Sequence, residues 1–98
     1  MKDAPKPPDT LSRGSRKLWR EILQTWPITD SAHLSILRVA LEAKDRADRC
    51  RDQINNDGEV VVDRFAQKKP HPLLGPERDS RAQFVNAISK LGLDPSEI

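Results

Sequence analysis

Three aspartates near the middle of the chain have the residue type and the spacing that could bind a metal ion. Asp45, Asp48 and Asp52 recur every three or four residues, which places them along one side of a helix. Asp45 also stands four residues before Arg49, a spacing at which opposite charges pair on a solvated helix face. Metal or acid–base chemistry needs carboxylates that converge in a pocket. We therefore predict a solvated helix face here and no metal site.

Histidine, cysteine and glycine form no catalytic or cofactor-binding pattern. His33 and His71 lie far apart, and neither has further ligands at metal-binding spacing, so we expect His33 at the surface near a helix start. Cys50 is the only cysteine, which excludes an intrachain disulfide and a zinc site built from thiolates. The four glycines are isolated and form no phosphate-binding loop. We predict no catalytic residue and no cofactor, and therefore no enzyme.

Basic side chains offer a different chemistry, the contact with nucleic-acid phosphates. The whole chain has 17 Lys and Arg against 15 Asp and Glu, but residues 1–26 hold six basic and three acidic groups. Such a surplus is typical of a phosphate-binding surface and also of an ordinary solvated helix face. The predicted DNA-binding residues are Arg13, Arg16, Lys17, Arg20, Lys68 and Lys69. A weaker second candidate, interleaved with acids, is the set Arg46, Arg49 and Arg51.

The first four of these residues need a helix to position them. Ser12 or Ser15 can cap a helix that runs to about Trp26, where Pro27 ends it. Its apolar residues follow one helical stripe and are expected in the core: Leu18, Trp19, Ile22, Leu23 and Trp26. Residues 1–11 contain three prolines and no periodicity, so we expect a disordered tail followed by a single helical domain over residues 12–98.

A second, longer helix is expected over residues 31–55, with Thr29 and Asp30 as capping residues and Gly58 after its end. In its second half the apolar side chains narrow to one stripe of mainly small residues. The stripe consists of Ala43, Ala47, Cys50 and Ile54. Such a seam suits close contact with another helix, from this chain or from a neighbouring subunit. We predict that these four residues form an oligomer seam.

The rest of the chain predicts a short extended segment and a third helix. The β-prone residues 59–62 could form a hairpin with Phe65, whereas two prolines should keep residues 68–72 extended and unpaired. A third helix is expected over residues 79–91, with Gly92 as its terminator. Its inward side chains should be Phe84, Val85, Ile88 and Leu91. The fold class is mainly α: a helical hairpin plus a third helix, with a short extended strap or small β-hairpin between helices two and three.

Length and composition support an oligomer rather than a monomer. A chain of 98 residues with 36% hydrophobic residues builds a thin core, and association is a usual remedy. No apolar run approaches the roughly 20 residues of a membrane span, and the first ten residues lack the apolar core of a signal peptide. We expect a soluble, intracellular protein.

Several short motifs occur in an order that resembles one large family of phage terminase small subunits. In chain order they are Ala4-Pro5 with Leu11-Ser12, Leu18-Trp19-Arg20-Glu21-Ile22, Ile28-Thr29-Asp30 with Leu34, Ile54-Asn55-Asn56-Asp57-Gly58, Lys69-Pro70-His71-Pro72 and Leu91-Gly92-Leu93-Asp94-Pro95-Ser96. They cover about residues 4–96. The final motif of the family commonly runs on into an Arg and a longer tail, whereas here Glu97-Ile98 follows.

The resemblance implies a ring-forming protein that recognises double-stranded viral DNA in the host cytoplasm. Such a subunit delivers the DNA to the terminase large subunit, which holds the ATPase motor and the nuclease, and regulates both activities. No catalytic residue, cofactor or membrane contact is implied. Two other functions fit the residue pattern: a dimeric helical DNA-binding regulator, and an assembly adaptor that contacts only proteins. The length and acidity of residues 31–55 disfavour a recognition helix of a helix-turn-helix regulator.

Overall fold

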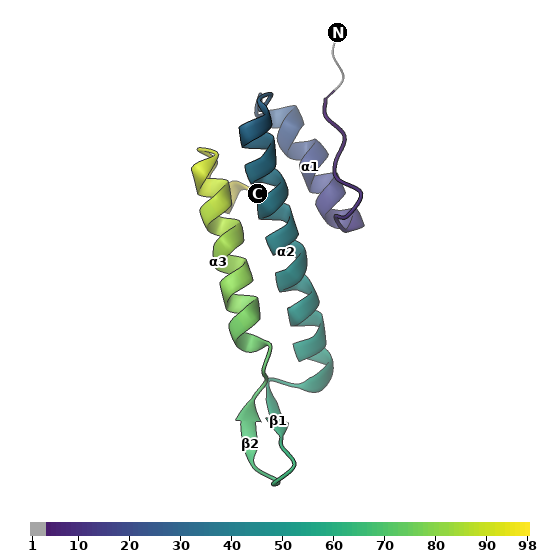
Figure 1. The fold of residues 1–98 in the computed structure, drawn as a ribbon, viewed down its shortest axis with the longest axis vertical. Coiled ribbons are helices and arrows are strands. Elements are labelled where there is room, and N and C mark those ends of the chain that lie inside the picture. The colour runs from purple at the N-terminus through teal and green to yellow at the C-terminus, as the bar shows by residue number, and fades with distance from the viewer. Residues whose placement is uncertain (1–3) are drawn as a thin grey trace.

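In the computed structural model, which describes residues 4–98, the chain forms a rod measuring 62 × 23 × 20 Å. In chain order the elements are α1 (Arg13–Thr25), α2 (Ser31–Asp57), β1 (Val60–Val62), β2 (Lys68–Pro70), α3 (Leu74–Lys90) and the 3-10 turn η1 (Pro95–Glu97). α2 lies between α1 and α3 over its first half, and the two strands project beyond the far end of α2 and α3 (Figure 1). The predicted mainly α fold class is confirmed.

The helix ends follow local capping signals. Ser12 is the N-cap of α1 and Asp30 is the N-cap of α2, each accepting a backbone N–H three residues later. Gly58 ends α2 with a φ of 88°, and Gly92 follows α3 with a φ of 77°, in the left-handed region that favours glycine. Leu93, placed after that glycine, is buried. The expected caps and terminators are therefore confirmed.

The core joins all three helices in the half of the rod that α1 covers. Apolar burial of this kind stabilises a fold by about 1.5–3 kcal/mol for each large side chain. The buried cluster consists of Leu11, Trp19, Ile22, Leu37, Ala40, Leu41, Ala87, Ile88 and Leu93. Trp26 packs against it and is partly buried. Both tryptophans thus serve in packing, as the stripe in the sequence predicted.

The second half of α2 uses its narrow stripe within the chain. Ala43, Ala47 and Ile54 are 0% exposed, and Cys50 is half-buried. α2 makes its main contact with α3, which runs back along it (Figure 1). Small side chains let two helices approach closely, and α3 of the same chain packs along this half of α2. The three fully buried residues have no surface left for a neighbouring subunit.

α3 begins five residues earlier than the sequence pattern indicated. Leu74 starts the helix, and Pro76 lies in the first turn, where the missing N–H of proline is not needed. Phe84, Ile88 and Leu91 pack against the core as predicted. Val85 was expected to face inward but is 41% exposed, so that part of the prediction was wrong.

The segment between α2 and α3 is a two-stranded antiparallel hairpin, with β1 paired to β2 in the register Val60↔Pro70 and Val62↔Lys68. The expectation that prolines would leave residues 68–72 unpaired was wrong for β2. Pro70 is accommodated because a two-stranded hairpin consists of edge strands only, where a missing N–H can face solvent. Phe65 lies in the connecting loop rather than in a strand.

The N-terminal segment runs beside α1 (Figure 1). Leu11, assigned to the tail from the sequence, is 3% exposed, and the indole Nε1 of Trp19 donates a hydrogen bond to the Pro5 carbonyl at 2.9 Å. Residues 1–3 of the expected tail lie outside the described residues. Within the described chain, no helix has the length and apolarity required to cross a membrane.

Candidate nucleic-acid interface

A buried carboxylate fixes α1, which carries most of the predicted DNA-binding residues, onto α2. Asp45 is 5% exposed and accepts hydrogen bonds from the Ser12 backbone N–H and the Ser12 hydroxyl, both at 2.7 Å, and from the buried Ser15 hydroxyl. Burial alone would raise the pKa of Asp45, but the hydrogen bonds from Ser15 and Ser12 outweigh it and hold that pKa below its usual value. The prediction that Asp45 lies on a solvated face was wrong, because its partners are about thirty residues away in sequence.

The basic residues of α2 and α3 are largely engaged with acids of their own chain. Glu77 accepts hydrogen bonds from Arg51 and Arg81, and Asp48 accepts from Arg81 at 2.9 Å and from Lys44 at 2.8 Å. The hydrogen bond from Arg51 is the main reason that the pKa of Glu77 lies below its usual value. These carboxylates are therefore charge partners, and no metal-binding group of side chains occurs in residues 4–98.

Arg46 and Arg51, in the weaker of the two predicted basic sets, also make intrachain contacts. Arg46 donates to Gln83 at 2.7 Å, and Arg51 pairs with Glu77 and Glu59. Phosphate binding by Arg51 would have to break these contacts first. The structure thus distinguishes Arg51 from the basic residues of α1, whereas Arg49 is exposed and has no acidic partner within residues 4–98.

On α1 the basic residues remain available. Arg13 and Arg20 are exposed and Arg16 is half-buried, and none of the three forms an ion pair with an acid of the described chain. Lys17 lies 3.9 Å from Glu21, but both side chains are exposed, and such surface pairs contribute little. The α1 basic face, which we define as Arg13, Arg16, Lys17 and Arg20, therefore carries nearly uncompensated positive charge.

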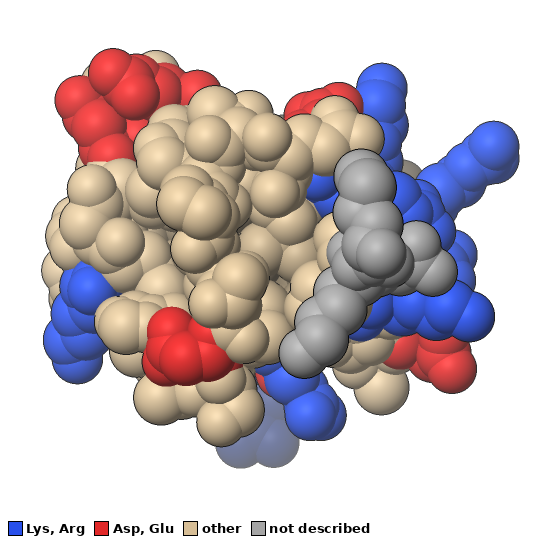
Figure 2. Space-filling model, turned by 90° about the horizontal axis from the view of Figure 1, so that it is seen from above, with Lys and Arg blue, Asp and Glu red and all other residues tan. Residues whose placement is uncertain are grey.

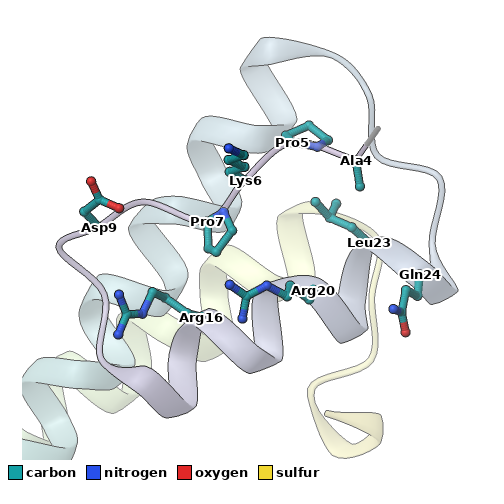
Figure 3. A pocket seen from close by; sticks show the side chains of 9 residues that line it. All are labelled: Ala4, Pro5, Lys6, Pro7, Asp9, Arg16, Arg20, Leu23 and Gln24. Atoms are coloured by element: carbon teal, nitrogen blue, oxygen red, sulfur yellow. The ribbon is translucent and has the colours of Figure 1, made fainter. Parts of the chain in front are cut away.

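The N-terminal segment adds a lysine to this face. Residues of the segment and of α1 enclose a cleft of about 560 Å³, in which Arg16 and Arg20 point from α1 toward the segment that carries Lys6 and Pro7 (Figure 3). Asp9 is the one acid among the residues that line the cleft. The hydrogen bond from Trp19 to Pro5 holds the segment in place, so three cations line one concave surface. A cleft with this charge suits the phosphate groups of a nucleic acid.

The distribution of charge over the end of the rod agrees with this assignment. Seen from above, Lys and Arg side chains gather mainly on the α1 side, and the remainder of this view is mostly uncharged, with separate acidic and basic groups at its edges (Figure 2). Lys68 and Lys69, the other two predicted DNA-binding residues, lie on β2 at the opposite end of the rod (Figure 1). The six residues thus form two separate basic surfaces.

Sequence reasoning did not identify Lys6, because a proline-rich start was interpreted as an unpacked tail. Leu11, an isolated apolar residue directly before the Ser12 cap, was the available signal that the preceding segment packs against the helix. His33, by contrast, lies where it was expected, exposed in the first turn of α2 with its ring Nδ1 bonded to Asp30.

Comparison with known proteins gives a family match. The family model described as phage terminase, small subunit, matches residues 15–98. No curated protein matches the chain significantly. No solved structure does so either.

Proposed function

Because this chain belongs to the family of phage terminase small subunits, which supports a role in genome packaging, we propose that it binds double-stranded viral DNA through the α1 basic face. As a ring oligomer, it then loads the DNA onto the terminase large subunit and regulates that subunit. The ATPase and nuclease activities belong to the large subunit, so the chain needs no catalytic residue, metal or cofactor of its own. This work takes place in the host cytoplasm.

The observation that carries the DNA-binding proposal is the difference in charge pairing between α1 and the other two helices. Arg51 and Arg81 are held by Glu77, whereas Arg16 and Arg20 line an open cleft together with Lys6. Free cations of the protein replace the counterions of DNA, and the release of those counterions raises the affinity of the protein for DNA. Contacts of this kind position a protein on the duplex and carry no sequence information by themselves.

The proposed ring follows from the family, and the thin core supports it. Closed rings form through head-to-tail interfaces, in which two different surfaces of each subunit meet. We propose that the interface differs from the predicted seam, because Ala43, Ala47 and Ile54 are covered by their own chain. Val39 on α2 and Val85 on α3 are among the large apolar side chains that remain exposed, at 54% and 41%.

The assembly is tested by the mass of the purified protein, measured by light scattering on a sizing column at moderate salt. We expect a single species of many subunits. A dimer that binds DNA would replace the packaging proposal with a DNA-binding regulator. A monomer or dimer without DNA affinity would favour an assembly adaptor.

DNA binding is tested with the double variant Arg16→Glu/Lys17→Glu. We expect about a tenfold or greater loss of affinity for duplex DNA, together with a salt dependence that is less steep by about two in the logarithmic slope. The matched variant Arg46→Glu/Arg49→Glu changes the net charge equally on α2 and should lose much less affinity. Equal losses in the two variants would show that only the net charge matters and that the α1 basic face is not the site.

A further inference from the structure

The hairpin exposes apolar side chains that nothing in the described chain covers. Val60, Val62 and Phe65 are 59%, 65% and 68% exposed. Directly paired residues of an antiparallel ribbon share a face, so the register places Val60, Val62, Lys68 and Pro70 on the same side. A lone two-stranded ribbon is marginally stable, and this one projects away from the helices (Figure 1). Its exposed face and tip are therefore suited to contact a partner.

The charges of the hairpin indicate which kind of partner fits. Its two acids are paired, Glu59 with Arg51 at 3.4 Å and Asp63 with Lys69 at 3.0 Å. Arg64 and Lys68 have no acidic partner in residues 4–98, and the Arg64 guanidinium lies 4.9 Å from the centre of the Phe65 ring. An exposed aromatic ring beside one free cation, with a second free cation on the adjoining strand β2, is complementary to a polyanion with stacked bases.

The loop that presents Phe65 is fixed by its own backbone. The Asp63 carboxylate accepts the N–H of Phe65 at 2.8 Å and the N–H of Gln67 at 3.0 Å. Between them Ala66 adopts a φ of 60°, and its N–H donates to the Asp63 carbonyl at 3.0 Å. The backbone that carries Phe65 is therefore fixed at the tip before any partner binds, which lowers the entropy that binding costs.

We propose that the hairpin is a second DNA-contacting element, in which Phe65 enters a groove of duplex DNA as a wedge between base steps while Arg64 and Lys68 contact the flanking phosphates. A two-stranded ribbon fits a DNA groove, and inserted apolar side chains unstack and kink the duplex. A neighbouring subunit fits less well, because burying two unpaired cations against protein is costly. This inference rests on the proposed DNA-binding function and extends it to the end of the rod opposite α1.

The test compares Phe65→Ala with Phe65→Tyr on a mixed-sequence duplex of roughly 20 base pairs, about the length of the 62 Å rod. Phe65→Ala should bind about tenfold more weakly with an unchanged salt slope, because stacking releases no counterions. Phe65→Tyr keeps the ring and should bind like the original protein. Arg64→Gln/Lys68→Gln should instead make the salt dependence less steep by about two.

A second readout is the shape of the DNA. With dyes at both duplex ends, energy transfer should report a bend with the original protein and with Phe65→Tyr, and a smaller bend with Phe65→Ala. Phe65 is exposed, so its replacement should leave the melting temperature unchanged. A lost bend thus cannot be attributed to unfolding.

The outcomes separate this inference from the proposed function. Loss of DNA binding in the α1 variant with no effect of Phe65→Ala would overturn the wedge and leave the α1 basic face intact. A lower mass of Phe65→Ala in light scattering, with DNA affinity and bending retained, would assign the hairpin to contacts between subunits and overturn the wedge. Absence of DNA binding by the unmodified protein would overturn both proposals.

Discussion

The Ser12 hydroxyl donates a hydrogen bond to Asp45 Oδ1 at 2.7 Å, across 33 residues of sequence, and accepts the N–H of Ser15 at 3.1 Å. One side chain thus caps α1 and also ties it to the middle of α2. The Ser12 N–H donates to the other carboxylate oxygen of Asp45, so the start of α1 is held at two points. The orientation of the α1 basic face consequently depends on a carboxylate of another helix.

Replacing Asp45 with Asn should destabilise the fold, and it should make the free energy of unfolding depend less on pH in the acid range. The amide offers one acceptor where the carboxylate offers two, and we expect a loss of about 1–3 kcal/mol in urea unfolding at pH 7. The pKa of Asp45 is lowered in the folded state, so its stabilisation is complete above the unfolded-state pKa of about 3.9. It is lost as the pH falls through the folded-state pKa, and Asp45→Asn should remove this part of the acid-induced loss.

Asp52→Asn is the matched control for that measurement. Asp52 belongs to the same run of aspartates but is exposed, so its replacement should change stability by less than about 0.5 kcal/mol. Equal unfolding curves for Asp45→Asn and the original protein would show that the buried carboxylate does not stabilise the contact between α1 and α2.

Replacing His71 should disturb the start of α3. His71 is 5% exposed, its Nε2 bonds Asp57 at 2.9 Å, and its Nδ1 accepts the N–H of Leu73 at 3.0 Å. His71→Leu leaves that N–H without a partner and should lower stability by about 1–3 kcal/mol in chemical unfolding. His71→Asn places an oxygen near the position of Nδ1, where it can accept the Leu73 N–H. This variant should therefore lose less stability than His71→Leu. If Leu and Asn are equally harmful, the hydrogen bond to Leu73 does not matter.

The N-terminal segment should contribute to DNA binding only while Trp19 holds it. Trp19→Phe removes the hydrogen bond to Pro5 and should cost about 1 kcal/mol of stability. Lys6→Gln alone should weaken duplex binding and make the salt slope less steep by about one. In the Trp19→Phe background the same change should have a smaller effect, because Lys6 no longer lies over Arg16 and Arg20. Additive effects in this double-mutant cycle would contradict the coupling.

Local features of the sequence were sufficient for much of the fold. Helix ends were predictable at Ser12, Asp30, Gly58 and Gly92, because capping depends on a residue and its nearest neighbours. Helical periodicity identified which side of α1 is buried, since that pattern only requires one face to be apolar. The start of α3 was missed because Leu73, its N-cap, makes no side-chain cap hydrogen bond that would mark it in the sequence.

The sequence by itself determined the helical class, the ends of the first two helices and the positions of the basic residues along the chain. Only the tertiary structure decided that Asp45 is buried, that Ala43 and Ala47 pack within the chain, and that Lys6 joins Arg16 and Arg20. The physical reason is the range of the interactions. Caps and periodicity act within a few residues, whereas the partner of a buried carboxylate or a free cation is set by which distant segments pack together.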